Sequence, residues 1–86
     1  MAHIRIYTTR TCGYCVAAKR YLKEQKAQSF EEIDVSQSPD VRRWLVEASG
    51  QTTVPQIFIG DRSIGGYSDL RALDAAGGLD PLLNAD

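Results

Sequence analysis

The only two cysteines of this 86-residue chain stand at positions 12 and 15, in the motif Cys-Gly-Tyr-Cys. Polar and apolar side chains alternate over residues 3–8, which predicts a strand just before the motif. The spacing of Cys15, Ala18 and Leu22 predicts a helix that begins at the motif, with Thr11 as its candidate N-cap. The start of a helix has unpaired N–H groups and a partial positive charge, which stabilise a thiolate, the form of cysteine that attacks disulfides. The motif therefore predicts a redox pair in which Cys12 is the nucleophile and Cys15, one helical turn later, is placed to attack it.

Composition and charge narrow the classes of protein to which the chain can belong. The formal net charge is −1, so no basic surface for nucleic acid is predicted. A length of 86 residues predicts one domain, over residues 1–86. No apolar run approaches ~18 residues and the first residues do not resemble a signal peptide, so we expect no membrane segment and a location in the reducing cytoplasm. In that compartment a Cys-x-x-Cys pair is usually catalytic or metal-binding. Zinc usually takes four ligands, whereas this chain offers two cysteines and His3, which favours redox catalysis over a metal site.

The rest of the chain alternates between strand and helix patterns. We expect strands over residues 3–8, 30–35, 56–59 and 62–64, and helices over residues 12–24, 39–48 and 67–76, followed by a short packed tail over residues 79–83. The first strand, helix and second strand predict a parallel pair with a right-handed crossover, and Gly60-Asp61 predicts a later antiparallel hairpin. In the second helix, Val41, Trp44 and Leu45 share an apolar face, and we expect Trp44 to pack in or near the core.

The order of these motifs resembles the glutaredoxins, most closely their small bacterial dithiol members. A strand precedes Cys-x-x-Cys at a helix start, Val54-Pro55 precedes a later strand, and Gly65-Gly66 precedes the last helix. The match extends along essentially the whole chain and includes residues 52–59, 64–66, 72–75 and 79–83. The resemblance implies an α/β chain with a thioredoxin fold: a four-stranded mixed sheet flanked by three helices, in the order β-α-β-α-β-β-α.

The resemblance also implies a chemistry and a ligand. Cys12 is expected to attack a glutathione mixed disulfide or a protein disulfide, and Cys15 to resolve the product when the substrate is an intramolecular disulfide. Glutathione is the expected co-substrate. The expected partners of the protein are disulfide-containing or glutathionylated proteins. The expected glutathione contacts are Tyr14, Arg42, Thr53, Val54, Pro55, Gly66, Tyr67, Ser68 and Asp69. Among them, a cis Val54-Pro55 bond is expected to turn the Val54 backbone toward Cys12, and the N–H groups at the last helix start, with Asp69, are expected to take the γ-glutamyl end.

The chain departs from the family pattern at several positions. Gly13 stands where many dithiol relatives have proline, Thr9 stands where relatives often have lysine, and Tyr67 and Ser68 are variants. Without that lysine, Arg42 is the preferred cation for the glycine carboxylate of glutathione, and Arg10 is the alternative. Capping of the last helix by Ser68 is the alternative to a binding role for that residue.

Two other functions stay open from the sequence. Some glutaredoxins without this proline bridge a [2Fe–2S] cluster between two chains, which would make Cys12 a cluster ligand and the protein a dimer instead of the expected monomer. An electron donor reduced by thioredoxin reductase would share the fold and the Cys-x-x-Cys motif. The Thr-Val-Pro and Gly-Gly-x-Ser-Asp motifs argue against this second alternative, because such donors lack the glutathione-binding residues.

Overall fold

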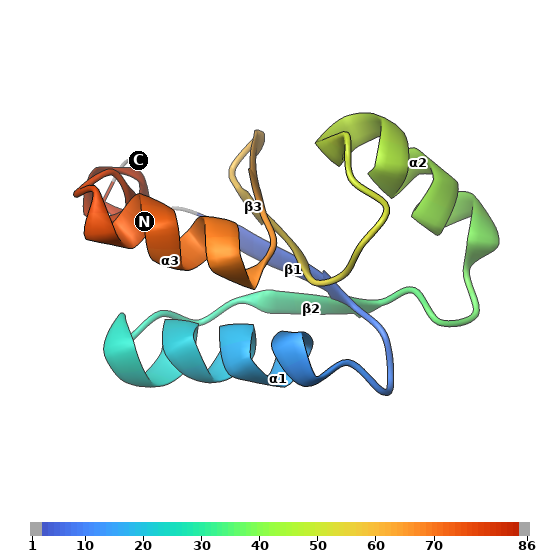
Figure 1. The fold of residues 1–86 in the computed structure, drawn as a ribbon, viewed down its shortest axis with the longest axis horizontal. Helices are drawn as coiled ribbons and strands as arrows, with labels where there is room; N and C mark the ends of the chain where they lie inside the picture. The colour runs from blue at the N-terminus through green and yellow to red at the C-terminus, as the bar shows by residue number, and fades with distance from the viewer. Residues whose placement is uncertain (1–2, 85–86) are drawn as a thin grey trace.

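A mixed sheet of four strands forms the centre of the molecule, and the computed structural model describes residues 3–84 (Figure 1). The strands are β1 (Ile4–Thr8), β2 (Glu31–Asp34), β3 (Gln56–Ile59) and β4 (Arg62–Gly65), and they lie in the order β2-β1-β3-β4. β1 pairs with β2 in parallel and with β3 in the antiparallel sense, and β3 pairs with β4 as an antiparallel hairpin. The predicted parallel pairing of the first two strands and the predicted hairpin are both confirmed.

Helices cover both faces of this sheet. They are α1 (Gly13–Arg20), a wider π-helical continuation η1 (Tyr21–Gln25), α2 (Pro39–Ser49), α3 (Tyr67–Ala75) and α4 (Leu79–Leu83). α1 and α3 run side by side on one face, while α2 lies on the other (Figure 1). The predicted tail at residues 79–83 is in fact the short helix α4, which buries Leu79 and Leu83 beneath α3 and adds a fourth α-helix to the predicted three. None of the helices within residues 3–84 is both long and apolar enough to cross a membrane.

The alternation of side chains along each strand divides the core into two layers. Ile4 and Ile6 of β1 and Ile57 of β3 face α1 and α3, where they pack with Leu22 and Leu70. All four residues of β3 are buried, because this central strand is covered on both faces. Complete burial of a Leu or Ile side chain stabilises the fold by roughly 1.5–3 kcal/mol, so this layer supplies most of the apolar stabilisation.

The layer beneath α2 is smaller and less completely covered. Tyr7, Leu45 and Phe58 are buried there. Trp44 packs against this cluster as predicted, with its ring centroid 5.9 Å from that of Phe58, yet its side chain stays 43% exposed. Val41 is also exposed, so Leu45 is the only buried member of the predicted apolar face. A single helix covers this side of the sheet (Figure 1), and the Arg5 guanidinium lies over the Phe58 ring, 5.3 Å from its centroid.

Ion pairs join the end of η1 to α3 and α4. Lys26 Nζ lies 2.9 Å from Asp74 Oδ1 and 2.7 Å from Asp80 Oδ1, and the Tyr21 hydroxyl donates a hydrogen bond to Asp74. The Tyr21 hydroxyl and the Lys26 ammonium hold the pKa of Asp74 below its usual value, and the two carboxylates raise the pKa of Lys26. These contacts fix the helix pair at the end far from the cysteines.

Candidate functional site

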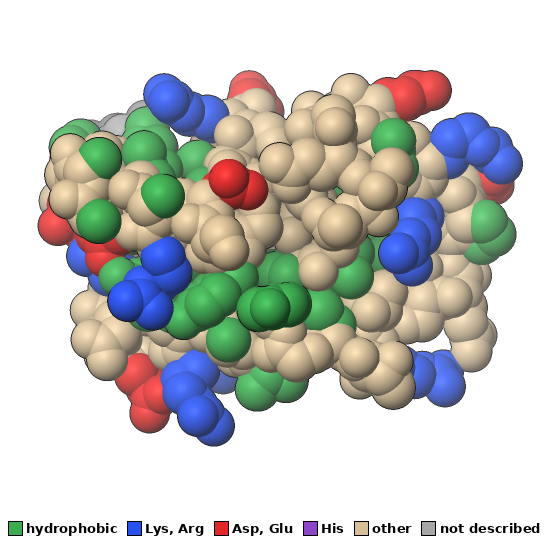
Figure 2. All heavy atoms as spheres, in the orientation of Figure 1, with side chains coloured by type: hydrophobic (Ala, Val, Ile, Leu, Met, Phe, Trp, Pro, Cys, Tyr) green, Lys and Arg blue, Asp and Glu red, His purple; other side chains and the backbone are tan. Residues whose placement is uncertain are grey.

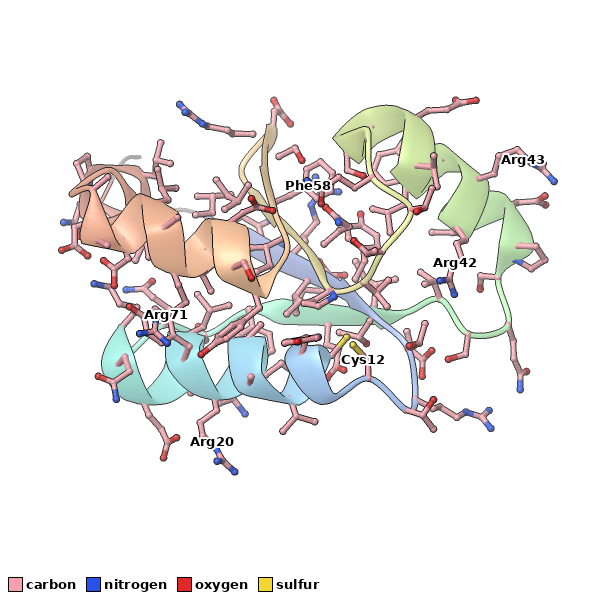
Figure 3. All side chains as sticks on the ribbon, viewed as in Figure 1. Cys12, Arg20, Arg42, Arg43, Phe58 and Arg71 are labelled. Carbon is pink, nitrogen blue, oxygen red and sulfur yellow. The ribbon has the colours of Figure 1, made fainter. Side chains whose placement is uncertain are left out.

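The two cysteines lie where β1 gives way to α1 (Figure 3). Cys12 is itself the N-cap of α1, and its Sγ accepts a hydrogen bond from the backbone N–H of Cys15 at 3.2 Å. The prediction of Thr11 as the cap is wrong, because the sulfur of Cys12 takes the position that a threonine oxygen commonly fills. Cys12 Sγ also donates to the carbonyl oxygen of Val54 at 3.4 Å. The helix start and the loop before β3 thus meet at this sulfur.

The two thiols differ in their environments. Both are free; Cys12 is half-buried, whereas Cys15 is 2% exposed. Burial, followed by the hydrogen bond with Cys12, raises the pKa of Cys15 to about 12, although the Thr9 backbone and Lys19 act in the opposite direction. Cys15 is therefore a protonated thiol at neutral pH, while Cys12 is the accessible sulfur that receives an N–H from the helix start. This difference fits an attacking and a resolving thiol.

A hollow of about 320 Å³ opens beside Val54, the residue that contacts Cys12. It brings together every predicted glutathione contact except Arg42. The residues that line it are Tyr14, Gln51, Thr53, Val54, Pro55, Gly66, Tyr67, Ser68 and Asp69. The Val54-Pro55 peptide bond is cis, as expected, and the Val54 carbonyl faces Cys12.

The floor of the hollow is formed by the close approach of α3 to the loop before β3. Gly66 is the N-cap of α3, and its backbone N–H donates to Asp69 Oδ2 at 3.0 Å. A Cβ on Gly66 would lie 3.3 Å from the Pro55 carbonyl oxygen, which leaves little room for a side chain. Ser68 does not cap α3, because Asp69 fills that role. The start of α3 therefore offers backbone N–H groups beside a carboxylate.

Aromatic rings form one wall of the hollow. Tyr67 stacks on the exposed Tyr14 with a centroid distance of 6.4 Å, and Tyr21 meets Tyr67 edge-on. The Tyr67 hydroxyl accepts a hydrogen bond from Arg71 Nη1 at 2.8 Å. Figure 2 shows hydrophobic side chains gathered in this area, between α3 and α1. The two tyrosines predicted as ligand contacts are thus in contact with each other.

Arg42 lies apart from these residues, on α2, on the opposite side of Cys12 from Arg71 (Figure 3). It lines a second hollow together with Arg10, Thr9 and three other residues of the neighbouring loops. Both candidate cations for the glycine carboxylate, Arg42 and Arg10, therefore share one hollow, and the geometry does not choose between them.

Sequence reasoning missed Gln51, which lines the first hollow, and Gln56, which is fully buried at the start of β3. Gln56 carried a detectable signal, because a polar residue within an apolar strand has to find hydrogen-bond partners. Gln51 carried none, because its neighbours in the hollow come from distant parts of the chain.

The zinc alternative gains no support from the geometry. His3 lies at the opposite end of β1 from the cysteines and approaches Glu31 of β2, 3.2 Å away. Within residues 3–84, no group of three or more His, Cys, Asp or Glu side chains is close enough to hold a metal ion.

Known proteins with similar sequences and structures agree on one family. The family model for glutaredoxin matches residues 4–64. Glutaredoxin 3 of Escherichia coli (strain K12) is 52% identical over 83 residues, which cover 96% of this chain and 99% of that protein. The solution structure of glutaredoxin from Brucella melitensis has a TM-score of 0.84 and 47% identity, and the match covers 96% of this chain and 89% of that one. A crystal structure of a buckwheat glutaredoxin–glutathione complex also has a TM-score of 0.84, with 30% identity, over 95% of this chain and 76% of that one.

These neighbours have the thioredoxin fold, so the predicted fold is confirmed. Both cysteines of the Cys-x-x-Cys motif are free and lie at the start of α1. On both counts the chain belongs to the glutaredoxin family of thiol–disulfide oxidoreductases.

Proposed function

We propose that this chain catalyses glutathione-dependent reduction of glutathione mixed disulfides and of protein disulfides. The observation that carries the proposal is the contact of Cys12 Sγ with Val54, which lines a hollow whose other residues suit a small peptide. The complex of buckwheat glutaredoxin with glutathione is a further support, since its fold matches this one closely. The reducing cytoplasm, expected from the sequence, would supply the glutathione.

The charges around the hollow suit the two ends of glutathione. The backbone N–H groups at the start of α3 suit the γ-glutamyl carboxylate, and Asp69 suits the neighbouring ammonium. The Thr53 and Val54 backbone suits an extended peptide that pairs like an added strand. The glycine carboxylate would be taken by Arg42, on the other side of Cys12 (Figure 3), or by Arg10, which lines the same hollow as Arg42. Glutathione would then lie across Cys12 with its sulfur at the nucleophile.

The first chemical step would be attack by the Cys12 thiolate on the glutathione sulfur of a mixed disulfide. The new bond joins Cys12 to glutathione, and the substrate protein leaves as a thiolate that takes a proton from solvent. A second glutathione thiolate then attacks the bound glutathione sulfur, which releases oxidised glutathione and restores the Cys12 thiolate. One disulfide is reduced in each cycle, with two electrons supplied by glutathione.

An intramolecular protein disulfide would need the second cysteine. Attack by Cys12 leaves the substrate tethered through one sulfur, and Cys15 then attacks Cys12 Sγ to release the reduced protein. Because the pKa of Cys15 is raised to about 12, its proton has to be removed as this step proceeds. Two glutathione molecules then reduce the Cys12–Cys15 disulfide.

The test is reduction of a glutathione mixed disulfide by the wild type, Cys12→Ser and Cys15→Ser, followed through NADPH oxidation with glutathione and glutathione reductase. We expect Cys12→Ser to be inactive and Cys15→Ser to keep most of its activity, because glutathione itself can resolve the intermediate. An inactive wild type that turns over only with thioredoxin reductase would contradict the proposal and favour the second kind of electron donor.

A further inference from the structure

Gln56 is a fully buried amide that holds the loop before β3 from beneath. Its Nε2 donates to Gln51 Oε1 at 2.8 Å and to the Thr53 carbonyl oxygen at 3.0 Å. Its Oε1 has no hydrogen-bond partner within residues 3–84. An unpaired buried oxygen disfavours folding, and an apolar side chain at the same place would avoid it. What glutamine provides here, and an apolar residue would not, is the pair of hydrogen bonds that Gln56 donates to the loop.

Gln51 extends these hydrogen bonds to the start of α3. Its Nε2 lies 3.4 Å from Asp69 Oδ2, the same oxygen that accepts the Gly66 N–H. The chain of contacts therefore runs from the buried strand β3 through Gln51 to the carboxylate at the mouth of the hollow. Gln51 is the one lining residue of this hollow that is not among the expected glutathione contacts.

The orientation of the Gln51 amide follows from its neighbours. Gln56 Nε2 is a donor and therefore requires the oxygen of Gln51, which leaves the Gln51 NH₂ group toward Asp69. Asp69 is exposed and, among residues 3–84, its other hydrogen-bond donor is the Gly66 N–H. A second donor on the same oxygen restricts rotation of the carboxylate and leaves its other oxygen free for a ligand cation.

We propose that Gln51, oriented by Gln56, is a positioning residue that holds the Asp69 carboxylate for the α-ammonium of a γ-glutamyl group. The inference rests on the proposed function, in which this hollow takes glutathione. A carboxylate held in this way favours ligands that carry a γ-glutamyl ammonium, because a fixed carboxylate loses less conformational freedom when the ammonium binds.

The test compares two mixed disulfides of one reporter peptide, one with glutathione and one with cysteinylglycine, which lacks the γ-glutamyl group. Reduced protein in excess, without free glutathione, gives the second-order rate constant for the first transfer to Cys12. We expect Gln51→Ala to slow transfer from the glutathione substrate about fivefold, as loss of one modest hydrogen bond predicts, and to leave the cysteinylglycine rate unchanged. Gln25→Ala, which removes an exposed glutamine from η1, is the matched control and should change neither rate.

Gln56→Leu tests whether Gln56 orients Gln51. We expect it to lower the selectivity between the two substrates in the same way as Gln51→Ala, and the double variant to be no worse than either single variant, because all three break one chain of contacts. An unchanged selectivity in Gln51→Ala, or an equal loss on both substrates, would overturn the inference while wild-type selectivity upholds the proposed function. A wild type that does not distinguish the two substrates would instead overturn the proposed binding of glutathione, and this inference with it.

Discussion

Gly65, the last residue of β4, controls the position of Asp69, and Gly65→Ala is the most informative single substitution. Its φ is +106°, a region that residues with a side chain rarely adopt. A Cβ at this place would overlap the Asp69 carboxylate and lie 2.8 Å from its Cγ and 2.9 Å from its Cβ. Rotation of the Asp69 side chain relieves the overlap with Cγ but not the overlap with Cβ, so the first turn of α3 has to shift as well.

The expected loss of stability has two parts. Strain at this φ is expected to cost about 1–3 kcal/mol, and loss of the Asp69 cap on the Gly66 N–H about 1 kcal/mol. The sum, roughly 2–4 kcal/mol, is a large fraction of the roughly 5–15 kcal/mol that holds a domain together. At about 4–8 °C for each kcal/mol, Tm should fall by roughly 10–30 °C. Displacement of Asp69 should also raise the KM for glutathione about tenfold or more, as loss of a charge-assisted hydrogen bond predicts.

Gly60→Ala is the matched control, because it adds the same methyl group at a positive φ without an overlap. Gly60 has φ +61°, and a Cβ there meets nothing within 4 Å. We expect a loss of only about 1–2 kcal/mol and no change in KM. Thermal unfolding and glutathione titration of both variants provide the measurement. Equal Tm values for the two variants, or an unchanged KM in Gly65→Ala, would refute the role assigned to the contact with Asp69.

Three further predictions follow from the burial and charges of other residues. Cys15→Ser should flatten the pH dependence of stability above pH 9. Because the pKa of Cys15 is raised, its stabilising effect is complete below pH 9.0 and is lost as the pH rises toward about 12. Urea midpoints across this range provide the measurement, and an equal dependence of the midpoint on pH in both proteins would contradict the prediction. Asp74→Asn should lower Tm at pH 7 and leave disulfide reduction unchanged. Because the pKa of Asp74 is lowered, its contribution to stability is complete above about pH 3.8 and is lost as the pH falls further, so the Tm values of the two proteins should converge on stronger acidification. Leu22→Ala should lower the free energy of unfolding in urea at neutral pH by about 2–5 kcal/mol. A loss below 1 kcal/mol would show that the core beneath α1, η1 and α3 can collapse around the missing side chain.

Most of the fold could be predicted because its signals are local. The apolar alternation of β1, the Gly60-Asp61 turn and Pro39 at the first position of α2 each act within a few residues. The N-cap of α1 was predicted wrongly because two neighbouring residues could both fill that position. Either Thr11 or Cys12 is near enough to cap α1, and preferences among caps favour threonine, whereas the turn out of β1 places the sulfur there.

Burial was harder to predict than secondary structure. The spacing of Val41, Trp44 and Leu45 describes one side of a helix but not how much of that side the sheet covers. The answer depends on the number of helices packed on that face, and α2 is alone there. The segment at residues 79–83 is too short to show a helical period, and it becomes a helix because Leu79 and Leu83 both reach the core beneath α3.

The sequence by itself determined the identity of the chemical groups: two thiols one helical turn apart, a Val-Pro before the central strand, and a Gly-Gly before the last helix. Each is a motif of consecutive residues, so its local conformation follows from short-range preferences. Only the tertiary structure decided that Gln51, Thr53 and Asp69 line one hollow while Arg42 lines another. That assignment depends on how the loop before β3 packs against α3, and such a contact between distant segments depends on the whole core beneath it.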